Sequence, residues 1–389
     1  MSKYIFSQVV DFVYRYEFDK CVNRYNGDFH VRELSCYNQF LHLLFGQLTA
    51  CESLRDICLC LKAHKRSLFQ LGFRQTVNES SLSRANERRD YRIYEDLGYY
   101  LIALVRPLYS NAPVADVDLP EYEIFALDST TISCSINLLT WALGKYSKGA
   151  VKMHVLLDLR GSIPAFIHIT DGKWHDSNVL DVMDFYPNEI YVMDRAYVDF
   201  EALFRIDQAG AFFVTRTKGN LKYDIIETHG NIDEATGLRG DHTIVLTGNK
   251  TKDLYPKPLR LVKAYDEEST EVIEFISNNM EIYPLDVANL YRNRWNIEVF
   301  NKWVKQNLVI KKLWGHSPNA VKTHLWVAIC AYLIVALIKA KYNSPYSITE
   351  VATLISVSAL EKADLKELLT APSNLLESNQ NVKELDLFD

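Results

Sequence analysis

Apolar residues recur at helical spacing near both ends of the chain and follow strand-like patterns in its middle. Residues 1–115 carry apolar positions three and four apart, which predicts an all-helical N-terminal domain. Turn residues at 110–120 then separate that domain from the strand-like region. A second apolar run, at 325–338, is too short to span a membrane and predicts a buried helix.

The middle of the chain predicts a mixed sheet. The elements expected there are strands at 122–132, 150–159 and 163–170, a helix at 177–185, a strand at 189–195, a helix at 200–209 and a strand at 211–216. This order is typical of an α/β fold of the ribonuclease-H type. Segments that alternate from 219 to 276 predict a β insertion, so the sheet domain would comprise 120–218 and 277–345. Residues 346–389 are expected to form a C-terminal helical segment and tail.

One helix is predicted from Tyr291 to Lys305, because no Pro or Gly interrupts its period. At about 100° per residue, one narrow arc of this helix carries Tyr291, Arg294, Glu298 and Lys305. Lys302 lies beside that arc. Another face carries an apolar stripe formed by Leu290, Ile297, Phe300, Val304 and Leu308. A single acid among cations and a phenol suits a site that holds a metal and a nucleic-acid backbone together. A surface helix of mixed charge is the alternative.

Charge is distributed unevenly along the chain. The net charge of −6 does not indicate a nucleic-acid binder, yet nine Lys and Arg residues between Tyr291 and Lys341 stand against the single acid Glu298. A local basic surface is what binding a polyanion requires. Seven Cys without regular pairing and the lack of a signal peptide predict reduced thiols in a cytoplasm. No P-loop or GxGxxG motif is present, which argues against a nucleotide cofactor.

A polar helix is also expected near the end of the N-terminal domain, at 78–89, after a helix and a turn. Its exposed side is predicted to carry Arg84, Asn86 and Arg88. Short hydrogen-bonding side chains beside Arg are typical of a helix that binds the DNA major groove. An ordinary helical hairpin with a solvated face is the alternative.

Three acids are candidates for metal ligands. Asp128 lies within an apolar strand, Asp194 ends another, and Glu298 lies on the later helix. In a ribonuclease-H-type sheet the first and fourth strands are neighbours, so these carboxylates would hold two Mg²⁺ ions, hard cations that prefer oxygen ligands. Each acid alone also fits a structural role. His175 and Asp176 are predicted to line the same cleft, as supporting or proton-handling groups.

The chain resembles the DDE transposases of bacterial insertion sequences, and in particular insertion-sequence family 4. The signature of that family is Tyr, two residues, Arg, three residues, Glu, six residues and Lys. Every spacing is matched here, by Tyr291, Arg294, Glu298 and Lys305. Residues 126–130 and 192–197 are similar to the motifs around the first and second aspartates of the family. The resemblance covers about 120–345.

The resemblance implies a cytoplasmic, nucleoid-associated bacterial enzyme that moves its own element by cut and paste. Asp128, Asp194 and Glu298 would be the metal ligands, for Mg²⁺ with Mn²⁺ as a substitute. Tyr291, Arg294, Lys302 and Lys305 would contact DNA phosphates. A homodimer would bind the terminal inverted repeats in double-stranded DNA, nick one strand, form a hairpin and join the freed ends to target DNA, with no membrane involved.

One feature departs from the family. Relatives stack a Trp of the β insertion on a flipped base, and residues 219–276 contain no Trp. Tyr223, Tyr255 and Tyr265 are the candidates to replace it, because stacking needs only an aromatic face. Two other functions compete with an active transposase: a transposition-inactive DNA-binding regulator on the same fold, and a metal-dependent phosphoesterase.

Overall fold

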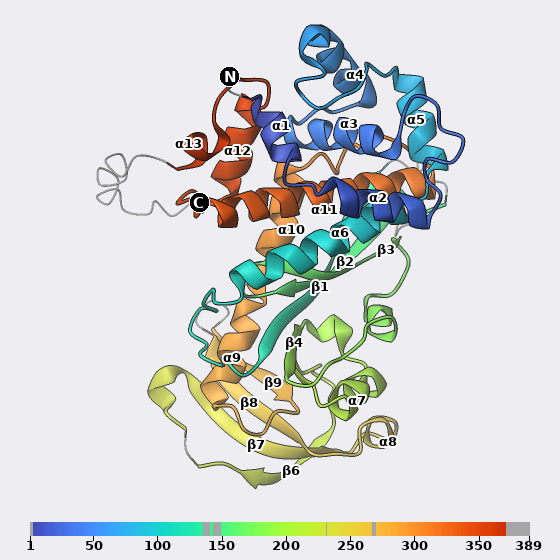
Figure 1. Ribbon diagram of the computed structural model, residues 1–389. Coiled ribbons are helices and arrows are strands. Elements are labelled where there is room, and N and C mark those ends of the chain that lie inside the picture. Colours follow the sequence, from blue (N-terminus) through green and yellow to red (C-terminus); the bar gives the residue numbers. More distant parts are fainter. Residues whose placement is uncertain (1–2, 135–140, 143–148, 231, 267–269, 371–389) are drawn as a thin grey trace. The chain divides into compact units, whose positions relative to one another are not determined.

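The computed structural model describes residues 3–134, 141–142, 149–230, 232–266 and 270–370. It divides the chain into two compact units. One unit combines Met1–Leu108 with Trp303–Asp389, and the other is Tyr109–Lys302. The first is helical and the second is built on a sheet, so the chain has a helical region at its N-terminus and a mixed α/β region, as predicted (Figure 1).

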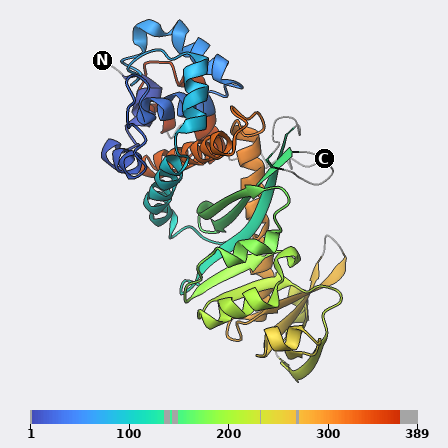
Figure 2. The same ribbon diagram turned by 90° about the vertical axis from the view of Figure 1, so that its right-hand side faces the viewer.

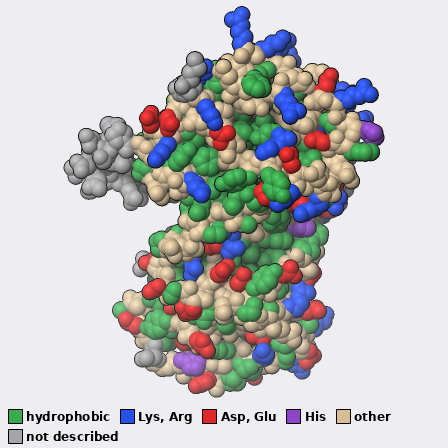
Figure 3. Space-filling model, in the orientation of Figure 1, with side chains coloured by type: hydrophobic (Ala, Val, Ile, Leu, Met, Phe, Trp, Pro, Cys, Tyr) green, Lys and Arg blue, Asp and Glu red, His purple; other side chains and the backbone are tan. Residues whose placement is uncertain are grey.

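The helical unit begins at the N-terminus of the chain and includes its last helices. Its helices are α1 (Ile5–Val10), α2 (Arg15–Arg24), α3 (Cys36–Leu48), α4 (Leu54–Ala63), α5 (Glu79–Arg88), α6 (Arg92–Val105), α11 (Pro318–Lys341), α12 (Ile348–Ser358) and α13 (Leu365–Leu369). Polar side chains start several of them: Ser53 caps α4, Asn78 caps α5, and Ser347 with Glu350 forms a capping box on α12. Figure 3 shows Lys and Arg side chains projecting from this unit.

Helix α11 is the centre of the helical unit. It packs against α3, α5, α6 and α12, and all its residues from Leu325 to Ile338 are buried. Among the described residues α11 alone is long and apolar enough to cross a membrane, but 94% of its most apolar stretch is buried inside the protein. Burial by neighbouring helices accounts for this composition, as expected for the run at 325–338.

The second unit is built on one nine-stranded sheet with the order β3-β2-β1-β4-β5-β9-β8-β7-β6 (Figure 2). Its strands are β1 (Glu123–Cys134), β2 (Gly149–Asp158), β3 (Ile163–Asp171), β4 (Glu189–Met193), β5 (Phe212–Arg216), β6 (Tyr223–Thr228), β7 (Leu238–Leu246), β8 (Leu259–Asp266) and β9 (Glu271–Ser277). Strand β4 runs parallel to both β1 and β5, and every other pairing is antiparallel. The tight turn between β2 and β3 needs Gly161, which has φ +78° and whose Cβ would meet Tyr109.

Two predicted features of this unit differ in detail. The helix expected at 177–185 is a short 3₁₀ segment, Asp176–Asp181, whereas α7 (Phe200–Gln208) forms as expected. The strands of the predicted insertion do form, but they extend the same sheet, because β9 pairs with β5. The insertion is therefore continuous with the first five strands.

An apolar layer covers one face of the sheet around α7. It combines alternate residues of the central strands, such as Phe125, Leu127 and Met193, with Leu203 and Ile206 of α7. Because successive strand residues point to opposite faces, Asp128 lies on the face away from Leu127.

The predicted helix at 291–305 forms as two helices. Helix α9 (Pro284–Asn293) packs on β4, β5 and β7–β9, and α10 (Trp295–Asn307) follows after a break at Arg294. The predicted apolar stripe is confirmed, because all five of its residues are buried. The boundary between the compact units falls within α10, at Trp303, so 303–345 groups with the N-terminal helices, whereas the predicted boundaries assigned it to the sheet domain.

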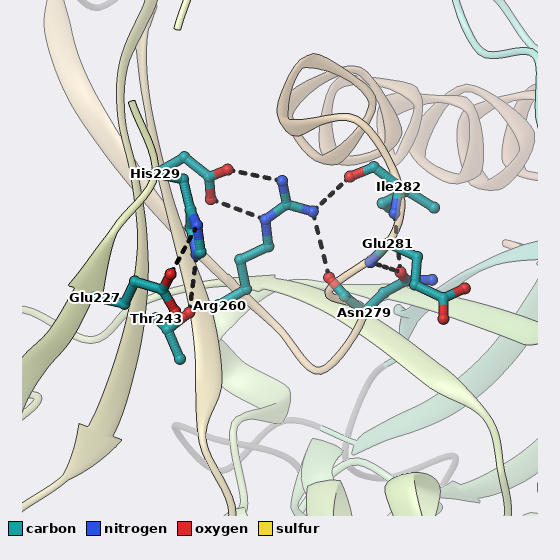
Figure 4. Close-up of polar contacts among 8 residues, drawn as sticks. Glu227, His229, Thr243, Arg260, Asn279, Glu281 and Ile282 are labelled. Atoms are coloured by element: carbon teal, nitrogen blue, oxygen red, sulfur yellow. Dashed lines mark hydrogen bonds and ion pairs between the residues drawn. The ribbon is translucent and has the colours of Figure 1, made fainter. Parts of the chain in front are cut away.

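A buried ion pair joins the distal strands to the start of α9. Arg260 of β8 donates two hydrogen bonds to Asp241 of β7, both 2.8 Å long, and both side chains are 6% exposed. The same guanidinium also donates to the carbonyls of Asn279 and Ile282, in the loop that leads into α9 (Figure 4). Arg260 therefore fixes the loop from which the helix with Tyr291 starts.

Replacing Arg260 with Ala should lower the free energy of unfolding by about 3–5 kcal/mol, because Asp241 would remain buried without its partner. Arg205→Ala is the matched control: Arg205 pairs with Asp181 at the surface, and such pairs contribute about 1 kcal/mol or less. Thermal and urea unfolding of the two variants measures the difference. Equal losses in both variants would show that the buried pair does not hold the loop.

Candidate functional site

Asp128 and Asp194 occupy matching positions on two neighbouring parallel strands: Asp128 lies in the middle of β1, where its pairing with β4 stops, and Asp194 directly follows β4. The pairing between β1 and β4 ends with Leu127 and Met193, and the two acids are the next residue in each chain segment. Residues in the same register point to the same face, so the two carboxylates lie side by side at this end of the sheet. The Asp194 carboxylate also accepts a hydrogen bond of 3.0 Å from the backbone N–H of Ala196, which begins a short 3₁₀ turn.

Helix α10 brings Glu298 to the same end of the sheet. One turn after Glu298, Asn301 donates a 3.2 Å hydrogen bond from its Nδ2 to Oδ2 of Asp128, and Asn301 is itself buried. Residues three apart share a helix face, so the bond that ties α10 to β1 also directs Glu298 toward Asp128. Sequence analysis missed Asn301, although its spacing from Glu298 is a signal that could have found it.

The Asp128 carboxyl has an unusual pKa. This pKa is raised to about 6. Burial is the largest cause, and the charge of Glu298 also raises the pKa, whereas the backbone N–H of Ser129, the charge of Arg294 and the hydrogen bond from Asn301 lower it. The side chain is thus held where its ionised form is costly unless a cation is close.

Two residues of the Tyr-Arg-Glu-Lys signature contact the acids directly. Arg294 donates a 2.6 Å hydrogen bond from Nη2 to Oε1 of Glu298, and the Arg294 side chain is 15% exposed. The hydroxyl of Tyr291 donates a long hydrogen bond, 3.5 Å, to Oδ2 of Asp194, and its ring packs on Phe275. In this conformation Arg294 therefore neutralises an acid and is not left open to a phosphate.

The remaining predicted cations lie further along α10. Lys302 is exposed, and Lys305 is half-buried in the last turn. Lys305 belongs to the helical unit, beyond the boundary at Trp303.

Asp176 is hydrogen-bonded to Ser129, the residue after Asp128 on β1, and therefore lies on the face of the sheet opposite to Asp128. Its Oδ1 accepts a 2.7 Å hydrogen bond from the Ser129 hydroxyl and pairs with Nζ of Lys152 at 2.9 Å. Burial alone would raise the pKa of Asp176, but the hydrogen bonds and charge from Ser129 and Lys152 hold it below its usual value. His175 is exposed and caps the following 3₁₀ segment by accepting from the Ser177 backbone N–H.

The acids fit a divalent cation by the chemistry of their donors. Three carboxylates supply hard oxygen ligands, and the buried Asp128 carries a charge that lacks full compensation. Within the part of the chain that the structure describes, however, no three His, Cys, Asp or Glu side chains are gathered closely enough to hold a metal as they stand. The pairing of Glu298 with Arg294 is a contact that a metal ligand would have to exchange.

Comparison with known families gives these acids a context. Residues 119–334, more than half of the chain, match the family described as the transposase DDE domain. This chain belongs to the DDE transposases. Residues 1–74 match a domain of unknown function, DUF4372. The matches confirm the predicted family, and they place the adjacent aspartates and Glu298 of this transposase within its DDE domain.

Named relatives of this transposase agree with the family. A protein of Synechocystis named as a transposase for insertion sequence element IS4SA is 29% identical over 280 residues, which cover 70% of this chain and 76% of that protein. The protein y4zB of Sinorhizobium fredii, also named as a transposase, is 28% identical over 250 residues, or 63% of this chain and 69% of that protein. A transposase named for element IS5377 of Geobacillus stearothermophilus is 30% identical over 209 residues, 54% of each chain.

Helix α5 of this transposase presents only part of its predicted polar face. Arg84 and Arg88 are exposed, but Asn86 is 1% exposed and accepts a 2.7 Å hydrogen bond from Gln39 of α3. The prediction that Asn86 contacts DNA is therefore wrong: Asn86 is buried and joins α5 to α3. Helical periodicity alone could not show that α3 offers a buried amide partner on that side.

The three candidate stacking tyrosines differ in their exposure to solvent. Tyr255 is 1% exposed and Tyr223 is half-buried, with its hydroxyl 3.4 Å from Glu274. Tyr265 is exposed, and the guanidinium of Arg239 lies over its ring. Of the three, Tyr265 is the one that offers an open aromatic face.

In metal-free buffer at pH 7.5, Asp128→Asn should raise the melting temperature. Folding raises the pKa of Asp128 to about 6, so ionisation above that pH costs stability that Asn does not lose. One pKa unit corresponds to about 1.4 kcal/mol, which makes about 3 kcal/mol the upper bound, and the gain should vanish below about pH 4.

Asp176→Asn is the control, because its melting temperature should change in the opposite direction. Its pKa is lowered by Ser129 and Lys152, so its charged form stabilises the fold, and the Asn variant should melt lower at pH 7.5. Calorimetry of both variants at pH 7.5 and pH 4 checks the pair. A lower melting temperature for Asp128→Asn at pH 7.5 would show that the ionised Asp128 carboxylate does not destabilise the fold.

Proposed function

We propose that this DDE transposase moves its own insertion sequence by binding the terminal inverted repeats and catalysing metal-dependent strand cleavage and strand transfer, by cut and paste. The observation that carries the proposal is the matched position of Asp128 and Asp194 on parallel strands, with Glu298 directed to them by the Asn301 hydrogen bond. A structural role for each acid would not require two of them to lie in matching register on neighbouring strands and the third on a helix tied to one of those strands.

The sheet supports a ribonuclease-H-like core. Three antiparallel strands are followed by two that run parallel to the first, in the order β3-β2-β1-β4-β5. In the ribonuclease-H-type sheet expected from the sequence, the first and fourth strands are neighbours, as β1 and β4 are. In this interpretation β6–β9 are an insertion that lengthens the sheet from β5 and leads back to α9.

Mg²⁺, with Mn²⁺ as a substitute, is the metal that we assign to Asp128, Asp194 and Glu298. Two such ions, when bound, activate a water or a 3′-hydroxyl and stabilise the leaving oxygen of a phosphodiester. The residues of the chain prepare this site: Asn301 orients Asp128, and the Ala196 N–H orients Asp194. Arg294 neutralises Glu298 and would be released to a DNA phosphate when Glu298 takes a metal.

The remaining signature residues are proposed to hold DNA near the cut. Tyr291, Lys302 and Lys305 would contact phosphates along the α9–α10 segment, and His175 and Asp176 would support the site from the far side of β1. A hairpin intermediate needs a base to leave the stack, and Tyr265 is proposed to receive it in place of Trp. The exposed Arg84 and Arg88 of α5 would bind the terminal repeats.

The wider setting follows from the family resemblance. A homodimer is proposed to form on the two repeats, because two ends must be cut and joined together to target DNA. The protein would act in the bacterial cytoplasm, at the nucleoid where its substrate lies. The named relatives support this setting, since two of them are named as transposases for insertion sequence elements.

Glu298→Gln should retain binding to a terminal-repeat duplex and lose cleavage by about 10³-fold or more, because a metal ligand contributes several kcal/mol. Gln can still accept the hydrogen bond from Arg294, so the fold should be kept. The assay is nicking of an oligonucleotide taken from the DNA that flanks the coding sequence, with Mg²⁺ or Mn²⁺. The exposed Glu281→Gln variant is the control and should cleave normally. Normal cleavage by Glu298→Gln would refute its assignment.

Replacing both Arg84 and Arg88 with Ala should weaken binding to the same duplex and reduce its salt dependence. Each lost phosphate contact lowers the slope of log K against log salt by about 0.9, so the double variant should lose about 2. Arg15→Ala with Lys20→Ala removes the same charge from α2, where both cations pair with acids, and should change little. Fluorescence anisotropy at several salt concentrations measures both, and identical slopes would exclude α5 as the contact.

A further inference from the structure

Helix α4 and the turn after it present cations on one exposed surface of the helical unit. At about 100° per residue, Arg55, Leu59 and Lys62 fall within an arc of about 60° on α4. The 3₁₀ segment η1 (Lys65–Ser67) follows and adds two more cations, Lys65 and Arg66. Figure 3 shows Lys and Arg side chains over the part of the unit where Figure 1 labels α4. All four cations are exposed, and among the described residues none of them pairs with an acid.

Large apolar side chains are exposed beside these cations. Phe69 is 86% exposed and Leu59 is 63% exposed. The turn that carries Phe69 is anchored, because the carbonyl of Leu68 accepts a 2.9 Å hydrogen bond from the backbone N–H of Phe73. Leu68, Leu71 and Phe73 are each 5% exposed or less. The buried neighbours therefore hold Phe69 outward, and water surrounds a ring that costs free energy to leave there.

The charge of this region is opposite to that of the whole protein. Residues 53–77 contain five Lys and Arg and one acid, Asp56, whereas the net charge of the chain is −6. The Asp56 carboxylate accepts a 2.7 Å hydrogen bond from the hydroxyl of Ser53 at the start of α4. A basic surface concentrated in this way on an acidic protein is suited to a polyanion.

Duplex DNA fits this surface better than an anionic membrane does. Binding in a membrane interface needs an apolar helix side that can enter the lipid, and the apolar side of α4 is already buried against α3 and α5. The exposed surface instead combines several cations with one aromatic ring. Proteins that bind DNA use cations on phosphates and apolar side chains on sugars and bases in the groove.

We propose that a second DNA-binding surface of this transposase, the α4 face, consists of Arg55, Leu59, Lys62, Lys65, Arg66 and Phe69. Its cations bind phosphates of duplex DNA, and Phe69 contacts sugars or bases in the groove. The inference rests on the proposed function, because it assumes that the protein binds DNA. It adds a surface to α5 and gives a role to residues 1–74, which match a domain of unknown function. Phosphate contacts carry no sequence information, so this face would strengthen binding to any duplex.

Replacing both Lys62 and Arg66 with Ala tests the cations. The double variant should weaken binding to the terminal-repeat duplex and to an unrelated duplex of equal length, and should lower the slope of log K against log salt by about 2. Lys3→Ala with Lys20→Ala removes the same charge from the same unit, where both cations pair with acids, and should leave the slope unchanged. Fluorescence anisotropy of the full-length protein at several salt concentrations measures both.

Phe69→Ala tests the apolar contact separately. The substitution removes no charge, so it should weaken DNA binding by about tenfold at every salt concentration and leave the slope unchanged. Tyr16→Ala removes an aromatic ring that is 71% exposed on α2, and should change neither quantity. Because these rings are exposed, thermal unfolding should be the same in both variants and in wild type.

The outcomes separate the α4 face from the function on which it rests. An unchanged slope in the Lys62 and Arg66 variant, with a lowered slope in the Arg84 and Arg88 variant, would overturn the α4 face alone. Wild-type protein that binds neither duplex would overturn the DNA function and this inference together.

Two further results bear on the α4 face itself. Unchanged affinity in Phe69→Ala would overturn the groove contact. Binding to phosphatidylglycerol vesicles that the Lys62 and Arg66 variant loses, with its DNA binding unchanged, would show that the face binds a membrane. A lowered slope in the cation variant and a lowered affinity in Phe69→Ala, with both controls unchanged, support the inference.

Discussion

The half-buried carboxylate of Asp128 is the constraint around which the sheet unit is arranged. An Asp within an apolar strand costs free energy when it ionises, and Asn301 offsets part of that cost by donating a hydrogen bond to the carboxylate. Asp194 follows the neighbouring strand in matching register. The hydrogen bond from Asn301 ties α10 to β1, and that tie determines where Glu298 lies. The hydrogen bond to the Asp128 carboxylate thus connects β1 with α10, which are far apart in the sequence.

Local pattern was sufficient to predict much of this arrangement. The spacing from Tyr291 to Lys305 identified the acid and its cationic neighbours, and the apolar strands identified both aspartates. A ribonuclease-H-type sheet also predicts that the first and fourth strands are neighbours, and β1 and β4 do pair, in parallel. These features depend on nearest neighbours in sequence or on simple topology.

Other features depend on partners far away in the chain, and pattern could not predict them. Asn86 had the polarity of a DNA contact, but Gln39 supplies a buried amide for it. The pairing of Arg294 with Glu298 is different, because it is local: the two residues are four apart, and the pair competes with the phosphate contact that the signature predicts.

The pairing of β9 with β5 has a consequence for how modular this protein is. Residues 219–276 supply the strands that complete the hydrogen bonding of β5, and β5 in turn pairs with β4, the strand that Asp194 follows. A deletion of this segment would leave β5 as an open edge, which invites pairing with other chains. The segment therefore cannot be exchanged between proteins as a loop could: any graft would have to carry a strand in the register of β9.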